Sequence, residues 1–387
     1  MATTVFGRDE IILLLGAGAS VEAGIPDSNS MVQEIENLIS VDERWTRFKD
    51  LYRYIRSSIF YADGLRGIFG DTVPFNIERL VIVLEELHKR ERHTLYPFVG
   101  AWNPKLQEVA GNGFENILAF RSSIIDILRN QWVVLPQEES AEYYSGLLRF
   151  QREYQYPLRV FSLNYDLCIE KACSLTYVQR GFHQREWEWR LFNETSDDPL
   201  PIMLYKLHGS VDWSFNEDGK VRYFDSPSSI RDEDVAIIFG TSYKLQYIDP
   251  FLFCAYELRR WTLDSARVIV CIGYGFNDDH INGILEQALR QNPERQLLAV
   301  VGPGDEQKVA AEKERICQYL RLDDGTDKVV TKACGAKEFF GNGLTISALA
   351  ELFPQEDDLF PPLADNTGDE AGADSLHAFA QFRDQEQ

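Results

Sequence analysis

The first apolar stretch of the chain breaks into a glycine-rich turn. Residues 11–15, IILLL, hold no polar side chain, and their length and β-branched start predict a parallel strand buried on both faces. In the segment GAGAS that follows, Gly16 and Gly18 leave room for backbone amides to approach a phosphate, and Ser20 is expected to cap a helix. A plain glycine turn between a core strand and a helix explains the segment equally well.

The next region has a different periodicity. Residues 29–155 place apolar residues three and four positions apart in successive segments such as FNIERLVIVLEELHKR, which predicts helices. Asn76, Asn112 and Pro136 stand near the starts of later segments, where helix-starting residues belong. We expect a helical insertion that serves packing and interaction.

Strand-like runs return after this insertion. Four of them end in a polar or glycine-rich turn, at the edge where open parallel sheets bind ligands. A hairpin is expected around Asp218-Gly219, and the alternating run 187–191 predicts a further strand. The main strand-like runs are residues 158–166, 202–210, 235–242, 266–275 and 297–304, and helices are expected at 251–266 and 280–291.

These patterns predict an α/β fold with three regions. Residues 1–28 and 156–354 form a Rossmann-like domain, into which residues 29–155 are inserted. Residues 355–387 are acidic and rich in small residues, so we expect a flexible tail. Within the tail, SLHAFAQF could form a short docking segment, although a loosely tethered end is the simpler interpretation.

Charge and composition exclude several classes of function. The formal net charge of -22 and the pI near 4.7 argue against direct binding to a nucleic-acid backbone. No apolar stretch is long enough to span a bilayer, and the first ten residues resemble neither a signal peptide nor a presequence. We therefore expect a cytoplasmic protein that binds neither nucleic acid nor membrane directly.

The cysteines and histidines do not predict a metal site. The six cysteines form no C-x-x-C pair, so a structural zinc ion is not expected and the thiols are interpreted as core residues. The histidines at positions 88, 93, 183 and 377 have no ligand-like spacing.

Two polar motifs follow consecutive predicted strands. One is Asn164-Tyr165-Asp166, which by itself is most simply a helix cap, and the other is His208-Gly209-Ser210, which by itself is most simply a turn. Because the ends of parallel strands meet at one edge, their combination behind a glycine turn favours a shared site over an accident of packing.

The ordered motifs GAGASVEAGIP, SLNYD, KLHGS, IIFGTS and CIGYGFNDDHI resemble the sirtuin-like superfamily. Gly24, which stands two residues too late for the usual dinucleotide fingerprint, and Ile25-Pro26 fit this family. The resemblance implies a Rossmann-like sheet that binds NAD, with the nicotinamide end near the Asn-Asp and His motifs. The chain departs from protein-deacetylating sirtuins because it lacks their four-cysteine zinc ribbon, and Ser28-Asn29 and Leu163 differ from their pattern.

The long helical insertion, the GYGFND turn and the segment CGAKEFF resemble instead the sirtuin-like NAD hydrolases of bacterial anti-phage defence. That resemblance implies Asn164 and His208 as catalytic residues, with Asn164 holding a water or the ribose and His208 acting as general base. For Asp278 and His280, helix capping is the preferred interpretation. The implied NAD-binding residues are Gly16, Ala17, Gly18, Ser20, Pro26, Asp27, Asp166, Gly240, Thr241, Gly273, Tyr274 and Gly275.

The resemblance implies an enzyme with NAD as its substrate and without a metal. The alternatives are a protein deacylase or ADP-ribosyltransferase, which needs a groove for an acceptor, and a non-catalytic sensor of NAD or ADP-ribose. Because unrestrained NAD hydrolysis is toxic, we expect control by assembly, as a homo-oligomer and with a partner. Candidate partners are a HerA-type ATPase translocase, an Argonaute-like protein or a phage protein.

Overall fold

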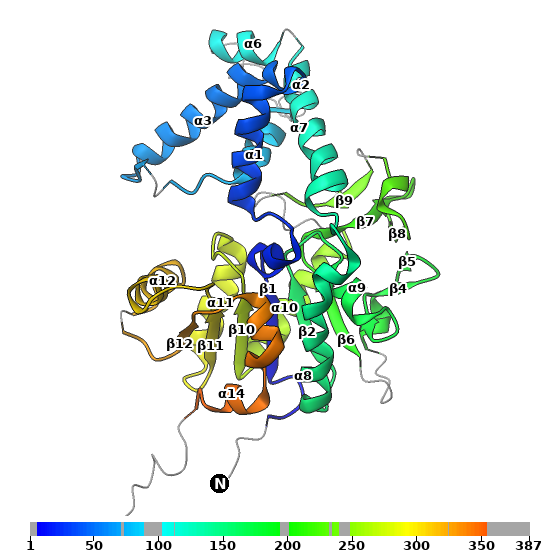
Figure 1. Cartoon of the computed structure of the whole chain (residues 1–387), viewed down its shortest axis with the longest axis vertical. Coiled ribbons are helices and arrows are strands. Elements are labelled where there is room, and N and C mark those ends of the chain that lie inside the picture. Colours follow the sequence, from blue (N-terminus) through cyan, green and yellow to red (C-terminus); the bar gives the residue numbers. More distant parts are fainter. Residues whose placement is uncertain are drawn as a thin grey trace, which may run out of the picture.

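The computed structural model describes residues 6–70, 73–88, 103–111, 113–193, 201–231, 234–239, 248–323 and 325–353. It consists of a parallel sheet covered by helices, a group of helices at one end of the molecule, and a smaller antiparallel sheet beside them (Figure 1). The predicted acidic tail, as well as Gly240 and Thr241, lies outside the described residues.

The larger sheet has seven strands in the order β12-β11-β10-β1-β2-β6-β3, and every pairing in it is parallel. The central strand β1 pairs with β10 on one side and with β2 on the other, so the loops after β1 and β10 meet at a topological switch point. The strands are β1 (Ile11–Leu15), β2 (Leu158–Ser162), β3 (Val178–Gln179), β6 (Ile202–Lys206), β10 (Val268–Ile272), β11 (Gln296–Val300) and β12 (Val329–Lys332).

Helices cover both faces of this sheet, which explains the uninterrupted apolar run of β1. Ile11, Leu13 and Leu15 belong to one core cluster, whereas Ile12 and Leu14 belong to the cluster on the opposite face. The first face is covered by η1 (Ala17–Ala23), η5 (Glu138–Ser145), α8 (Gly146–Tyr154), α9 (Cys168–Cys173), α13 (Ala336–Glu338), η8 (Phe339–Gly343) and α14 (Ile346–Ala350). The second is covered by η6 (Trp189–Phe192), α10 (Phe251–Asp264), α11 (Asp279–Gln291) and α12 (Glu306–Tyr319).

A separate core unites the helices between η1 and η5, which we call the helical block. Its buried side chains, among them Ile35, Tyr52, Leu80 and Phe120, form one cluster that is distinct from the two clusters on the sheet. The helical block consists of α1 (Ser28–Val41), α2 (Glu43–Thr46), α3 (Lys49–Gly64), α4 (Ile77–His88), α6 (Pro104–Ala110), α7 (Glu115–Ile127) and η4 (Leu128–Trp132).

The division of the chain at residue 155 remains a prediction. The buried side chains of the predicted insertion, residues 29–155, belong to two different cores. Tyr144, Leu147, Phe150 and Tyr154 join the core of the parallel sheet together with β1. The segment from η5 to α8 therefore packs as part of the sheet domain, although its helical periodicity continues that of the helical block.

The smaller sheet is antiparallel and has the order β4-β5-β8-β7-β9. The predicted hairpin around Asp218-Gly219 is confirmed, because β7 pairs with β8 across it. Part of the strand-like run 235–242 forms β9, which pairs with β7 of the smaller sheet and not with a strand of the parallel sheet. The strands are β4 (Phe182–His183), β5 (Glu186–Trp187), β7 (Gly209–Phe215), β8 (Val221–Tyr223) and β9 (Val235–Ile237), and η7 (Pro227–Ser229) precedes β9.

The predicted strand at 187–191 is only partly correct. Trp187 ends β5, but the chain then turns into η6 because the Glu188 side chain accepts a hydrogen bond from the amide of Arg190. The fold class is confirmed as α/β with a Rossmann-like parallel sheet. Among the described residues, no helix is both long and apolar enough to cross a membrane.

Candidate functional site

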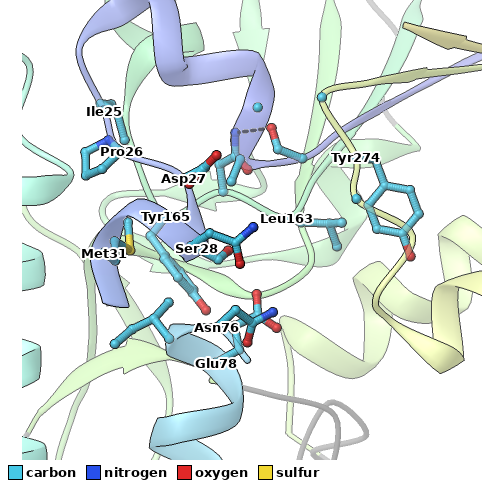
Figure 2. Close-up of a pocket in the computed structure, with 18 of the residues that line it drawn as sticks. Ile25, Pro26, Asp27, Ser28, Met31, Asn76, Glu78, Leu163, Tyr165 and Tyr274 are labelled. Carbon is cyan, nitrogen blue, oxygen red and sulfur yellow. Dashed lines mark hydrogen bonds between the residues drawn. The ribbon is translucent and has the colours of Figure 1, made fainter. Parts of the chain in front are cut away.

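A cavity lies at the carboxyl edge of the parallel sheet, where the helical block closes over it (Figure 2). Its volume is about 210 Å³, and its walls come from the loops after β1, β2, β6 and β10 and from the starts of α1 and α4. Asp27, Glu78, Asp166 and Asp278 line it, and the described lining residues include no Lys or Arg. We call it the acidic cavity.

Three glycines allow the loops after β1 and β10 to touch. The Gly18 amide donates a hydrogen bond to the Gly273 carbonyl oxygen at 2.9 Å, and the Gly16 amide donates to Ile272. A Cβ atom on Gly16 would lie 2.6 Å from the Gly273 oxygen, and one on Gly273, where φ is +61°, would lie 2.1 Å from the Ala19 nitrogen. The glycines thus serve backbone-to-backbone packing, and the Gly16 and Gly18 amides are engaged within the protein instead of facing a phosphate.

The late third glycine has a local explanation. Gly24 ends η1 in the left-handed conformation, with φ +88°, and its amide bonds back to the Val21 carbonyl. Ile25 and Pro26 then lead into the acidic cavity, where Asp27 also caps α1 by accepting from the Ser30 amide.

Ser20 does not cap a helix, contrary to the prediction. It lies within η1, is fully buried, and joins a hydrogen-bond network behind the acidic cavity. Its hydroxyl donates to Asp166 at 2.8 Å, accepts from the Asn164 amide at 3.1 Å and lies 2.8 Å from the Tyr144 hydroxyl. The other oxygen of Asp166 accepts from the amide of Cys168, the first residue of α9. Ser20 therefore positions Asn164 and Asp166.

Hydrogen bonds fix both the side chain and the backbone of Asn164. Its Nδ2 donates to the Gly16 carbonyl at 3.0 Å and to Ser20, and its backbone amide donates to the Ser162 hydroxyl at 3.1 Å. Because Nδ2 is engaged, Oδ1 is the atom of this amide that remains to accept a hydrogen bond at the cavity wall. The side chain is pre-oriented before any ligand arrives.

Four buried charges stabilise the loop that carries Asp166. The Lys206 ammonium donates to the Asp166 carbonyl oxygen and lies 3.6 Å from the Glu170 carboxylate. Arg180 lies 3.6 Å from the same carboxylate and donates to Asp212 at 2.7 Å. Burial raises the pKa of Glu170. Two cations and two acidic groups thus compensate one another, and removing one of them would leave the rest unbalanced.

His208 faces Asp278 across the acidic cavity wall. The two side chains are 2% and 4% exposed, and His208 Nε2 lies 3.5 Å from Asp278 Oδ2. Asp278 caps α11, as the sequence predicted, by accepting from the His280 and Ile281 amides through Oδ1. Its approach to His208 was not predicted, because the two residues belong to loops that only the fold brings together.

A second cavity adjoins the first across the glycine turns. Its volume is about 420 Å³, and it lies beyond the carboxyl ends of β10 and β11. Both cavities are lined by Gly18, Gly273, Tyr274 and Gly275. Glu22, Lys308, Glu312 and Arg315 supply the charged groups of the second one, which we call the mixed-charge cavity.

Tyr274 separates the two cavities without offering a charge. Its hydroxyl donates to Asn282 at 2.8 Å, and burial raises its pKa well above the usual value for tyrosine, so the ring stays neutral. Arg315 fixes the neighbouring Gly275 by donating to its carbonyl oxygen at 3.1 Å.

The structure brings most of the predicted site residues together, although their roles remain predictions. Ser20 lies behind the wall, and Gly240 and Thr241 lie outside the described residues. Asn76, which precedes α4, and Glu78 of α4 were missed as lining residues, and Asn76 gave only the signal of a helix start. The predicted residues that line the acidic cavity are Gly16, Ala17, Gly18, Pro26, Asp27, Asn164, Asp166, His208, Gly273, Tyr274 and Gly275.

All six cysteines are buried, as expected for core thiols. Among the residues with described positions, no group of three or more His, Cys, Asp or Glu side chains is arranged to hold a metal ion.

Comparison with known proteins adds a domain assignment. No curated protein matches the sequence. A sirtuin structure, Sir2Tm bound to a propionylated peptide, is 13% identical over 88% of this chain and 92% of its own, with a TM-score of 0.36. Residues 158–322 match the family model described as a SIR2-like domain, and this region includes Asn164 and His208. The domain match supports a sirtuin-type NAD-binding domain in this chain.

Proposed function

We propose that the chain is an NAD hydrolase that cleaves the bond between nicotinamide and ribose. The observation that carries the proposal is the pair of cavities that meet at the glycine turns. NAD has a cationic ring at one end and an anionic diphosphate in its middle. The acidic cavity suits the cationic nicotinamide ring, and Lys308 and Arg315 give the mixed-charge cavity cations for the diphosphate and adenosine part.

The proposed reaction needs fixed charge and a placed water. As the bond between C1′ and the ring nitrogen breaks, its electron pair neutralises the nicotinamide, and positive charge develops on the ribose. The carboxylates of Asp27 and Glu78 in the acidic lining stabilise that charge with groups fixed before the reaction. A water oxygen then bonds to C1′ and its proton passes to His208. NAD and water thus give nicotinamide, ADP-ribose and a proton.

Asn164 and His208 have separate roles in this scheme. Asn164 Oδ1 orients the water, since Nδ2 is held by Gly16 and Ser20. His208 accepts the proton through Nδ1, the ring nitrogen turned away from Asp278. Asp166 keeps the Asn164 loop in place through its hydrogen bonds with Ser20 and the Cys168 amide, so its main contribution is orientation.

Nicotinamide release from NAD tests the proposal. We expect Asn164→Ala and His208→Ala each to lower the rate at least about 100-fold, because positioned proton transfer and orientation contribute that much. His280→Ala and Asn130→Ala are matched controls, since both side chains lie outside the acidic cavity and their variants should retain the wild-type rate. Release by Asn164→Ala and His208→Ala at the wild-type rate would contradict the assignment.

Other outcomes identify other functions. Turnover of NAD that requires an acylated or acceptor peptide, with modification of that peptide, would favour a deacylase or ADP-ribosyltransferase. Binding of NAD by calorimetry without turnover, alone and with every candidate partner, would favour a sensor.

We also propose that assembly controls the activity and that the protein depletes NAD in anti-phage defence. The sequence resemblance supports this role and a HerA-type ATPase as partner. Tyr61, Leu65 and Phe69 on and just after α3 are each at least two-thirds exposed, and they offer an apolar surface for association. A monomer by light scattering at every concentration, with activity independent of any partner, would count against this control.

A further inference from the structure

Asp278 does more than cap α11, because each of its two carboxylate oxygens contacts a different group. Oδ1 accepts the first amides of α11, and Oδ2 points to His208 Nε2 at 3.5 Å. A carboxylate next to a ring nitrogen is satisfied only when that nitrogen carries the proton. Asp278 thus favours the His208 tautomer with a proton on Nε2.

The opposite ring nitrogen is left as an acceptor. His208 Nδ1 is buried and has no hydrogen-bond partner among the described residues, although the side chain is only 2% exposed. Buried nitrogen atoms in proteins are nearly always hydrogen-bonded, so an unpartnered one at a cavity wall indicates a place for a ligand or a water. With Nε2 protonated, Nδ1 has the lone pair that such a group would meet.

The surrounding backbone fixes both members of the pair. The His208 carbonyl accepts from the Ile238 amide at 2.9 Å, and the Asp278 carbonyl accepts from Tyr274 and from the Asn282 amide. His208 therefore depends on its partner mainly for its proton position, since its place in the fold is determined by the sheet.

We propose that Asp278 is a positioning residue that holds His208 in the Nε2-protonated tautomer, so that Nδ1 is the proton acceptor. This inference rests on the proposed NAD hydrolysis. Asp278 touches no substrate in this scheme and acts only through His208.

Asp278→Asn separates capping from positioning. Asparagine caps helices as well as aspartate does, and capping requires its oxygen to face the α11 amides. The amide group then presents an NH₂ donor to Nε2 where the carboxylate was an acceptor, and the proton of His208 must move to Nδ1. Asp279→Asn is the matched control, because it removes the same charge one residue along α11 from an exposed side chain.

We expect Asp278→Asn to keep its melting temperature within about 2 °C. Its kcat for nicotinamide release should fall at least about 10-fold with KM changed less than about 2-fold, because general-base catalysis is lost and binding is not. Asp279→Asn should match wild type. In the His208→Ala background, Asp278→Asn should have no further effect, since it acts through the missing ring.

Wild-type kcat in Asp278→Asn, or an equal further loss in the double variant, would overturn the inference. If wild type releases no nicotinamide under any condition, the proposed function fails, and the tautomer is then decided without turnover. In ¹⁵N-histidine NMR spectra, His208 should show a protonated Nε2 in wild type and a protonated Nδ1 in Asp278→Asn. The same ring signals in both proteins would overturn the role of Asp278.

Discussion

The acidic cavity and the mixed-charge cavity share a wall of glycines but differ in what surrounds it. Side chains from the loops after β2 and β6 reach into the acidic cavity, and the helical block covers it. Beyond the same wall, the mixed-charge cavity is lined by the loops after β10, β11 and β12 and by two cations of α12. The difference teaches that one sheet edge presents two chemically distinct surfaces, an acidic one beside the loops after β2 and β6 and one with cations of α12 beyond β10.

The shared wall gives the largest expected effect. Gly273→Ala should lower the free energy of unfolding by about 4 kcal/mol or more, because the new Cβ would meet the Ala19 nitrogen at 2.1 Å in a left-handed conformation. Gly283→Ala is the control, since nothing lies within 4 Å of that Cβ inside α11. It should stabilise the fold by up to about 1 kcal/mol. Denaturant unfolding measures both, and a mild loss in Gly273→Ala would show that the wall is pliable.

The stability of the loop that carries Asp166, in the wall of the acidic cavity, should depend on the buried charges behind it. Lys206→Met should cost about 3 kcal/mol, because it leaves Glu170 with one cation fewer and the Asp166 carbonyl without its donor. Lys171→Met removes the cation of an ion pair with Glu138 whose two side chains are 49% and 78% exposed, and it should cost less than about 1 kcal/mol. Equal costs by denaturant unfolding would contradict the importance given to the buried group.

The mixed-charge cavity should affect binding and leave chemistry intact. Lys308→Ala is expected to raise KM for NAD about 10-fold without changing kcat, because a single cation near a diphosphate contributes on the order of 1.4 kcal/mol. Lys313→Ala removes the same charge from α12 at a position outside the cavity, so its KM should stay at the wild-type value. Steady-state kinetics distinguishes the two variants. A fall in kcat for Lys308→Ala would contradict the prediction that the mixed-charge cavity affects only binding.

The smallest effect concerns the helical block that covers the acidic cavity. The Arg79 guanidinium donates to Asp63 and lowers the pKa of that carboxyl below its ordinary value of 3.8, which fixes α3 against the start of α4. The stabilisation is therefore complete above pH 3.8 and is lost as pH falls through the lowered pKa. Asp63→Asn should cost about 1 kcal/mol at pH 7 and little in strong acid. Denaturation at both pH values checks this, and an equal cost at each would exclude the ion pair as its cause.

Local sequence patterns predicted the elements whose structure follows from their own residues. An all-apolar run such as β1 fits only a strand covered on both faces, and Asp278 follows the general preference for helix caps. The apolar run that holds β9 gave no sign of its partner, because parallel and antiparallel strands share the same period of two. Its place was determined by pairing with β7.

The parts of the site that escaped prediction are contacts between distant segments. Oδ2 of Asp278 meets His208 only because β6 and β10 end at the same edge. Glu78 lines the acidic cavity because the helical block folds back over the sheet, which no local periodicity encodes. Ser20 was assigned to a cap because its residue type favours one, yet burial beside Asp166 gave its hydroxyl a stronger partner.

The central position of β1 has a consequence for how the protein is made. In the register with β2, Ile12 pairs with Arg159, whereas the partner of Ile11 is Val268 of β10, far later in the chain. At roughly 5–20 residues per second, the ribosome would expose this fully apolar strand for on the order of tens of seconds before β10 emerges. Newly made chains should therefore depend on chaperones that bind extended apolar segments, and slowed translation before residue 268 should lower the soluble yield.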